Sequence, residues 1–300
     1  MNPTLSAHAF FCPVLGGEQR SADGPTCPLL PLGAPALPFL QVQALQVQTL
    51  AEACWQSDGQ PVALLQSWAL AGLDWEEIYL QGVVPAAQLL GQWWLADRLD
   101  FVAVSVASTR LQQALYDLSP TFLAQAREAH NGLNALLFCN PGSQHSMGVF
   151  MLGEFFRKSG WRVSGLPLQS HASALRSVQS DWFDVAGLSV STNRCLDALG
   201  YLIQGLRTAS ANPALKIMVG GPMAILNRGL LLSLGADFIG GDARESQRLA
   251  LRYVKEDPRC KAEYSPCNST IDTTDRSPVL TTSDRQAASS KPISLPNRWP

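Results

Sequence analysis

Short apolar runs alternate with longer segments of helical apolar spacing over residues 134 to 255. Parallel strands need long crossover connections, so this alternation predicts a parallel sheet with helices on both faces. The expected fold is α/β, a flavodoxin-like, doubly wound, five-stranded sheet. Strands are predicted near Asn134–Cys139, Trp161–Ser164, Val185–Leu188, Lys216–Val219 and Asp237–Ile239. Helices are predicted near Val149–Ser159, Ala172–Gln179, Cys195–Ala209, Met223–Leu234 and Ala243–Lys255.

The preceding part of the chain, from about Val42 to Leu118, has helical apolar spacing throughout and predicts a four-helix bundle. Asp74, with Glu77 three residues later, predicts a helix that begins near Trp75. The other boundary signals are a first-turn proline at Pro85, an N-cap at Asp100 and a stop at Ser119-Pro120, followed by a connecting helical piece that reaches about His130.

Four regions follow: a flexible Pro/Gly-rich arm (1–40), a helical bundle (41–128), the α/β domain (132–256) and a disordered tail (258–300). We find no signal peptide and no apolar run long enough to cross a membrane, which predicts a cytoplasmic protein. The seven cysteines are scattered without a CxxC pair, as in reduced cytosolic proteins. The net charge of −2, without a basic cluster, argues against direct nucleic-acid binding.

The turns after the predicted strands carry the candidate functional residues, because open α/β sheets bind ligands outside the carboxyl ends of their strands. His145 follows the first strand, and we interpret it as a candidate axial ligand of a metal-containing cofactor. The other turns are Ser189-Val190-Ser191-Thr192-Asn193, Gly220-Gly221-Pro222 and Gly240-Gly241-Asp242. Their small residues leave room for something flat or long, and the Ser189 and Ser191 hydroxyls can form hydrogen bonds there. No P-loop and no GxGxxG is present.

These turns resemble the signature of a known family. The run His145-Ser146-Met147-Gly148, then Ser189-Val190-Ser191, then Gly220-Gly221 is similar to the DxHxxG, SxS or SxL, and GG motifs of cobalamin-binding domains. Upstream, Ala71–Tyr79, Pro85 and Gly91-Gln92-Trp93-Trp94 resemble the helical cap that precedes this domain in corrinoid methyltransferase proteins and B12 photoreceptors. The resemblance spans roughly residues 60 to 255.

The resemblance implies a role for each matching position. His145 would bind cobalt from below and displace the cofactor's own dimethylbenzimidazole base, and Gly148 completes that motif. Ser189, Ser191, Gly220 and Gly221 would line the slot for the displaced nucleotide tail. Trp93 or Trp94 would face the upper side of the corrin, although paired tryptophans in a helix are also common in packed cores.

Two departures from the family pattern bear on function. Ser143 stands where the family carries an acidic residue that orients the imidazole. Val104-Ser105 align with the Glu-His pair of light-dependent repressors. The upper side of the cobalt would therefore be open to water, to an adenosyl group or to the arm that contains His8.

The subgroup that keeps a Pro-Gly-x-x-His-x-x-Gly setting without the acidic partner is that of the AerR and PpaA regulators of purple photosynthetic bacteria. This resemblance implies a light- or redox-responsive antirepressor that binds adenosyl- or hydroxocobalamin, is not an enzyme and acts on a CrtJ/PpsR-like DNA-binding repressor. Two alternatives stay open at this point: a haem-binding redox sensor and a corrinoid methyl-transfer protein.

Overall fold

The alternating half of the chain folds into a single parallel sheet with the strand order β2-β1-β3-β4-β5. The computed structural model describes residues 41–126, 130–139, 146–164, 170–191, 196 and 198–257. The predicted arm (1–40) and tail (258–300) lie outside these residues. The strands are β1 (Asn134–Cys139), β2 (Arg162–Ser164), β3 (Val185–Ser189), β4 (Lys216–Gly220) and β5 (Phe238–Ile239). This order confirms the predicted flavodoxin-like fold, whose ligand-binding switch point lies between β1 and β3.

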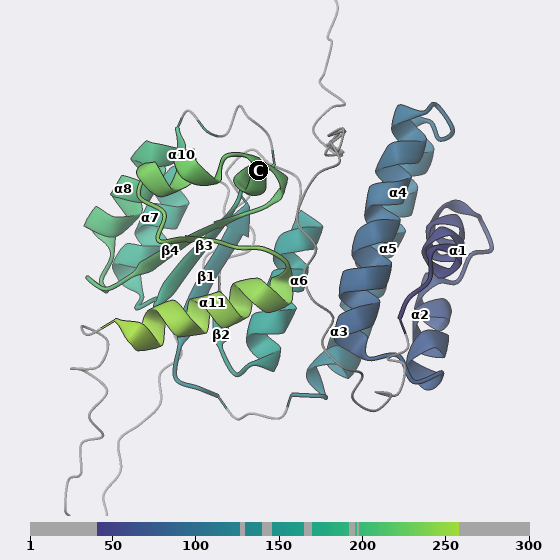
Figure 1. Ribbon diagram of the computed structural model, residues 1–300, viewed down its shortest axis with the longest axis horizontal. Coiled ribbons are helices and arrows are strands. Elements are labelled where there is room, and N and C mark those ends of the chain that lie inside the picture. Colours follow the sequence, from purple (N-terminus) through teal and green to yellow (C-terminus); the bar gives the residue numbers. More distant parts are fainter. Residues whose placement is uncertain are drawn as a thin grey trace, which may run out of the picture. The chain divides into compact units, whose positions relative to one another are not determined.

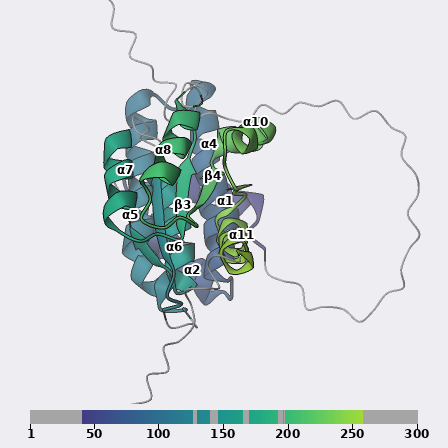
Figure 2. The ribbon, with the colours of Figure 1, turned by 90° about the vertical axis from the view of Figure 1, so that its left-hand side faces the viewer.

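Helices cover both faces of the sheet, and the alternation of side chains along β1 shows which helix covers which face. Leu137 packs with α6 (Ser146–Lys158) and α11 (Ala243–Glu256). Leu136 and Phe138 point to the opposite face. That face is covered by α7 (His171–Ser180), α8 (Leu199–Ala209), α9 (Pro222–Leu226) and α10 (Arg228–Ser233). Figures 1 and 2 show α7 and α8 on one side of the strands and α11 on the other.

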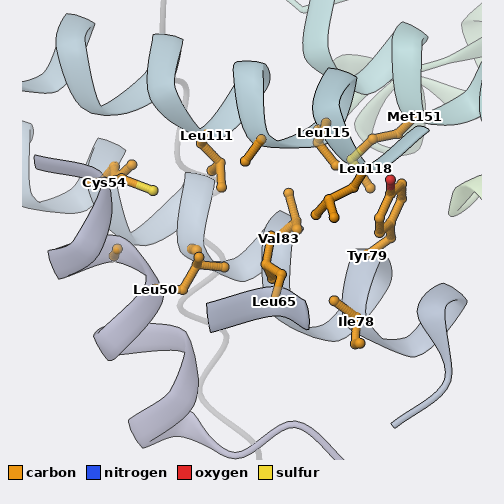
Figure 3. Close-up of a cluster of buried hydrophobic side chains, with 14 of the residues drawn as sticks. Leu50, Cys54, Leu65, Ile78, Tyr79, Val83, Leu111, Leu115, Leu118 and Met151 are labelled. Carbon is orange, nitrogen blue, oxygen red and sulfur yellow. The ribbon is translucent and has the colours of Figure 1, made fainter. Parts of the chain in front are cut away.

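The upstream part of the chain is helical, as predicted, and has its own apolar core (Figure 3). Its elements are α1 (Ala44–Trp55), α2 (Pro61–Leu70), α3 (Trp75–Glu77), the π-helix η2 (Ile78–Val83), α4 (Val84–Leu95) and α5 (Phe101–Leu123). The predicted N-caps are confirmed: Asp74 accepts from the Glu76 N–H at 2.8 Å, and Asp100 accepts from the Ala103 N–H at 2.7 Å. None of the described helices is long and apolar enough to cross a membrane.

Pro85 lies in the first turn of α4, as predicted. The π-helix η2 joins α3 to α4 without a break, because the Val84 N–H donates to the Tyr79 carbonyl five residues back. Two other predicted boundaries were wrong. Pro120 does not end α5, because Leu118 and Phe122 on either side of it are buried in the core and hold the helix together to Leu123. The single helix predicted over Met223–Leu234 is instead two short helices that meet at Asn227.

Helix α6 belongs to both apolar cores. Val149 and Phe156 pack against the sheet, whereas Met151 and Phe155 pack into the core of the helical region. Figure 3 shows Met151 beside Tyr79 and the α5 leucines. Phe155 lies against Phe122, with ring centroids 5.2 Å apart. The helical region is therefore packed directly on the sheet domain.

A half-buried ion-pair network joins the same two regions at the other end of α6. Glu76 of α3 accepts from Lys158 of α6 at 2.9 Å and from Arg244 of α11 at 2.7 Å, and Arg244 also binds Glu77 at 2.8 Å. Burial alone would raise the pKa of Glu76, but the hydrogen bonds and positive charges of Lys158 and Arg244 outweigh burial and hold that pKa below its usual range.

We expect Glu76→Gln to lower the free energy of unfolding by about 1–3 kcal/mol at neutral pH, because it removes hydrogen bonds to a charged group. The pKa of Glu76 is lowered in the folded state, so its contribution is present above the ordinary pKa of about 4.3 and is lost as pH falls through the lowered value. The difference between parent and variant should shrink in acid.

Urea unfolding at a series of pH values measures this difference. Glu256→Gln is the matched control, because Glu256 forms an exposed ion pair with Arg252 of the same helix, and such pairs contribute about 0–1 kcal/mol. Equal losses for Glu76→Gln and Glu256→Gln would contradict the assignment of Glu76 as the structural link.

Candidate functional site

The predicted small-residue turns meet at the carboxyl edge of the sheet. In the strand register, Cys139 of β1 pairs with Ser189 of β3, and Ser189 pairs with Gly220 of β4. The Val190 N–H donates to the Gly220 carbonyl at 2.8 Å and ties the two turns together. Adjacent parallel strands thus bring Ser189, Gly220 and the residues that follow them to one edge, at the β1/β3 switch point.

The two glycines after β4 differ in what surrounds them. Gly221 has φ +96°, and a Cβ built on it would lie 2.6 Å from the Val190 carbonyl oxygen and 3.1 Å from the Ser189 Oγ. Only glycine tolerates that backbone and that close approach. A Cβ on Gly220 would meet no heavy atom of the described residues within 4 Å. Gly221 therefore makes the tight turn, and Gly220 borders open space.

Gly148, in the first turn of α6, likewise has no described heavy atom within 4 Å of where a Cβ would lie. Ser189 is half-buried and Ser191 is buried, so a ligand in this region would meet hydroxyl groups at the edge and below it. Cys139, the last residue of β1, is the thiol next to these residues. Burial raises the pKa of Cys139 to about 11, so at neutral pH it stays a thiol and not a thiolate ligand.

The predicted cobalt ligand, His145, lies outside the described residues, as does Ser143. In sequence, it joins directly to Ser146, the first residue of α6. Within the described part of the chain, no group of three or more His, Cys, Asp or Glu side chains could hold a metal ion. The assignment of His145 thus stays a prediction.

Helix α5 runs parallel to α6 and extends beyond its beginning. Gln112 contacts Ser146 at 3.2 Å, and the Tyr116 ring meets the Phe150 ring edge-on with centroids 4.5 Å apart. The segment Phe101–Leu111 precedes these contacts and covers roughly 16 Å at the helical rise per residue. Because α6 begins at the carboxyl edge, this segment, the α5 extension, lies beside that edge (Figure 1).

Small, uncharged side chains line the α5 extension on the side that continues from Gln112. Ser105 lies two turns before Gln112 and on the same face. The hydroxyls of Ser105, Ser108 and Thr109 each donate to the carbonyl four residues earlier, at 2.6, 2.7 and 2.8 Å. Val104, the neighbour of Ser105, is buried in the core. The face at Ser105 thus offers hydroxyl oxygens and no imidazole.

The two predicted cap tryptophans lie close to this extension but in different surroundings. Trp93 is 6% exposed, packs in the helical core and carries Arg98 over its ring at 4.9 Å. Trp94 is half-buried at the rim of the same core. The Leu99 N–H donates to the Trp93 carbonyl and brings the end of α4 next to the beginning of α5. Contact of either ring with a cofactor stays a prediction.

Sequence reasoning missed Gln112 and Tyr116, which link α5 to the beginning of α6. No motif marks them. Their only signal in the sequence is that Gln112 and Tyr116 are uncharged and four residues apart on an exposed helix face, and such pairs are common.

The strand order and the glycine-lined carboxyl edge define a ligand-binding domain of the flavodoxin-like class. Residues 133–250 match the model of the family described as "B12 binding domain". Over these residues the chain is similar to B12 binding domains.

Two relatives and one solved structure extend the comparison. The chain is 25% identical over 179 residues to "Uncharacterized 20.5 kDa protein in bchF-crtJ intergenic region" of Rhodobacter capsulatus, which covers 60% of this chain and 93% of the relative. It is 29% identical over 204 residues to "HTH-type transcriptional repressor CarA" of Myxococcus xanthus, 64% of this chain and 65% of that repressor. The fold is similar to the monomethylamine corrinoid protein of Methanosarcina barkeri, with TM-score 0.59, 16% identity and coverage of 70% of this chain and 99% of that one.

We expect Gly221→Ala to destabilise the domain by about 1–3 kcal/mol, because alanine strains the positive φ and its Cβ meets the Val190 carbonyl. Gly220→Ala, one residue away and directed into open space, should change stability by no more than about 0.5 kcal/mol. Urea unfolding of both variants measures the contrast. Losses of equal size would contradict the different surroundings of the two glycines.

Proposed function

We propose that this chain is a cobalamin-binding, light- or redox-responsive regulatory protein that acts through a protein partner. The observation that carries the proposal is the open space beside Gly220 at the β1/β3 switch point, in a chain segment that matches the B12-binding domain. A long tail can pass a glycine with no neighbour within 4 Å, whereas any side chain would narrow the passage. The described residues at this edge of the sheet therefore fit the nucleotide tail of cobalamin.

In this proposal each site residue has a stated task. The His145 imidazole would bind the cobalt, and Gly148 would leave room for the cofactor beside the first turn of α6. Ser189, Ser191, Gly220 and Gly221 would line the slot for the nucleotide tail, the serines through hydrogen bonds and the glycines through close backbone approach. Trp94, or Trp93 after a rearrangement of the core, would contact the corrin. Cobalamin supplies, when bound, a cobalt–ligand bond that light or a redox change can break or exchange.

The regulatory output rests on the relatives and on charge. One relative is named for the bchF-crtJ intergenic region and another as a transcriptional repressor. This chain has a net charge of −2, and its sequence carries no cluster of Lys and Arg of the kind that direct DNA binding uses. We therefore infer an antirepressor that works in the cytoplasm by binding a CrtJ/PpsR-like repressor of photosynthesis genes, with residues 41–128 as the cap and 132–256 as the cofactor domain.

Two other functions would use the same fold. Similarity to a corrinoid protein supports a methyl-transfer component, but Ser143 removes the carboxylate that raises the basicity of the ligand imidazole. Methyl transfer from methylcobalamin to a thiol acceptor would identify that activity. A Soret band after expression with haem, without corrinoid uptake, would identify a haem sensor.

We expect the purified protein to take up hydroxocobalamin with a change in its visible spectrum, and His145→Ala to weaken this binding at least tenfold, because loss of groups that only orient a ligand already costs 10–100-fold. His171→Ala, at the first residue of α7, is the control. Equal affinity of His145→Ala and the parent would overturn the ligand assignment. Absence of uptake by the parent would overturn the cofactor.

We further expect the cobalamin-loaded protein to release a CrtJ/PpsR-type repressor from its operator DNA, without binding that DNA itself. Gel shifts with repressor, labelled operator and increasing amounts of this protein, in the dark and after illumination, measure the release. The His145→Ala variant is the matched control. A direct shift of DNA by this protein alone would contradict the partner-mediated mechanism.

A further inference from the structure

Gln112 forms a polar link between the cap helix α5 and the beginning of α6. Its Nε2 donates to the Tyr116 Oη at 2.6 Å and to the Ser146 Oγ at 3.2 Å, so both N–H groups of the amide have an acceptor. The Tyr116 ring in turn packs edge-on against Phe150, one helical turn further along α6. Gln112 therefore fixes its own side chain against Tyr116 and directs one donor at the first residue of α6.

The place of this link matters because Ser146 is covalently joined to His145. The acidic residue that would orient the imidazole from two positions earlier is Ser143 in this chain. Further along α6, the contacts with α5 are aromatic, as between Phe122 and Phe155. Within the described residues, the side-chain hydrogen bond nearest in sequence to the proposed cobalt ligand thus comes from the cap.

Resting on the proposed function, we propose that Gln112 is a positioning residue that restrains the first turn of α6 and couples it to α5. A displacement of the first turn of α6 on cofactor binding would move Ser146, and through Gln112 and Tyr116 it would reach helix α5. Two of the side chains that would carry the change outward, Val102 and Val106, are exposed on the α5 extension.

The free energy of the hydrogen bond between Gln112 and Ser146 is in the range that a reversible conformational change requires. A neutral hydrogen bond contributes a net stabilisation that corresponds to about a 2- to 12-fold bias in an equilibrium. Such a bias is large enough to favour one arrangement of α5 and α6 and small enough to be reversed when a ligand binds or leaves.

Hydrogen exchange of the cofactor-free protein tests the restraint by itself. Gln112→Met removes both hydrogen bonds at similar volume, and Ser146→Ala removes the acceptor. Each should raise exchange of the amides in the first two turns of α6 by about 2- to 12-fold, and the double variant should add little beyond either single one. Gln113→Met is the control, since Gln113 makes the same kind of bond to Asp117, at 2.8 Å, within α5 alone.

Gln112→Glu is the conservative rescue, because its carboxylate can accept from the hydroxyls of both Tyr116 and Ser146. We expect it to restore parental exchange. Parental exchange in Gln112→Met, or equal increases in Gln112→Met and Gln113→Met, would overturn the proposal.

Coupling is then measured by adding hydroxocobalamin. In the parent, uptake should alter exchange in α5, including the α5 extension. In Gln112→Met the α5 response should be lost while the cofactor still binds, an uncoupling that a merely structural residue would not produce. An α5 response of parental size in Gln112→Met would overturn the coupling. If the parent binds no hydroxocobalamin, the proposed function falls, and the exchange of the cofactor-free variants alone decides the restraint.

Discussion

The packing of α6 on both of its sides is the contact on which the arrangement of the site depends. One side buries Val149 and Phe156 against the sheet, and the other buries Met151 and Phe155 in the helical core. Each fully buried side chain of this size contributes about 1.5–3 kcal/mol, so both regions gain from the same helix. A shift of α6 would disturb both cores at once, because close-packed interiors do not deform gradually.

Polar groups lie inside this apolar contact as well. Glu154 is 1% exposed, and one of its oxygens binds Arg157 at 2.9 Å while the other has no hydrogen-bond partner among the described residues. The Tyr79 hydroxyl is also buried without a partner, and burial, with the Glu154 charge as a smaller cause, raises the pKa of Tyr79. Unpaired buried groups lower stability, so the contact between cap and domain is weaker than its apolar area suggests. A weaker contact favours movement between the two.

Much of the fold was predictable because the signals are local. Strand β1 has the predicted bounds Asn134–Cys139, since an apolar run buried on both faces has no other stable position in a parallel sheet. Asp100 begins α5 for an equally local reason, because its carboxylate accepts an N–H three residues away. Pro120 misled the prediction because tertiary packing of Phe122 overrides the local cost of a proline.

The site was predictable only in part, because only some of its features depend on local sequence signals. The turns at Ser189 and Gly220 follow strand ends, so topology alone brings them together. The difference between Gly220 and Gly221 depends on the distance to Val190 on another strand, and no spacing rule reveals it. The contact between Gln112 and Ser146 joins residues that are far apart in sequence, and it exists only because α5 and α6 pack in parallel.

These features bear on the choice between the regulatory and the catalytic form of the proposed cobalamin function. A corrinoid that cycles through reactions needs a strongly held lower ligand, and the carboxylate that would strengthen it is replaced by Ser143. On the α5 extension, the Ser105 hydroxyl already donates to the Phe101 carbonyl and has no proton left for a ligand. The polar contact next to the proposed ligand comes instead from Gln112, on a helix whose outer face carries Val102 and Val106. The proposed ligand is weakly restrained by its own segment of the chain, and the start of α6 next to it is connected to the exposed helix α5. Both features favour a conformational change over a catalytic cycle.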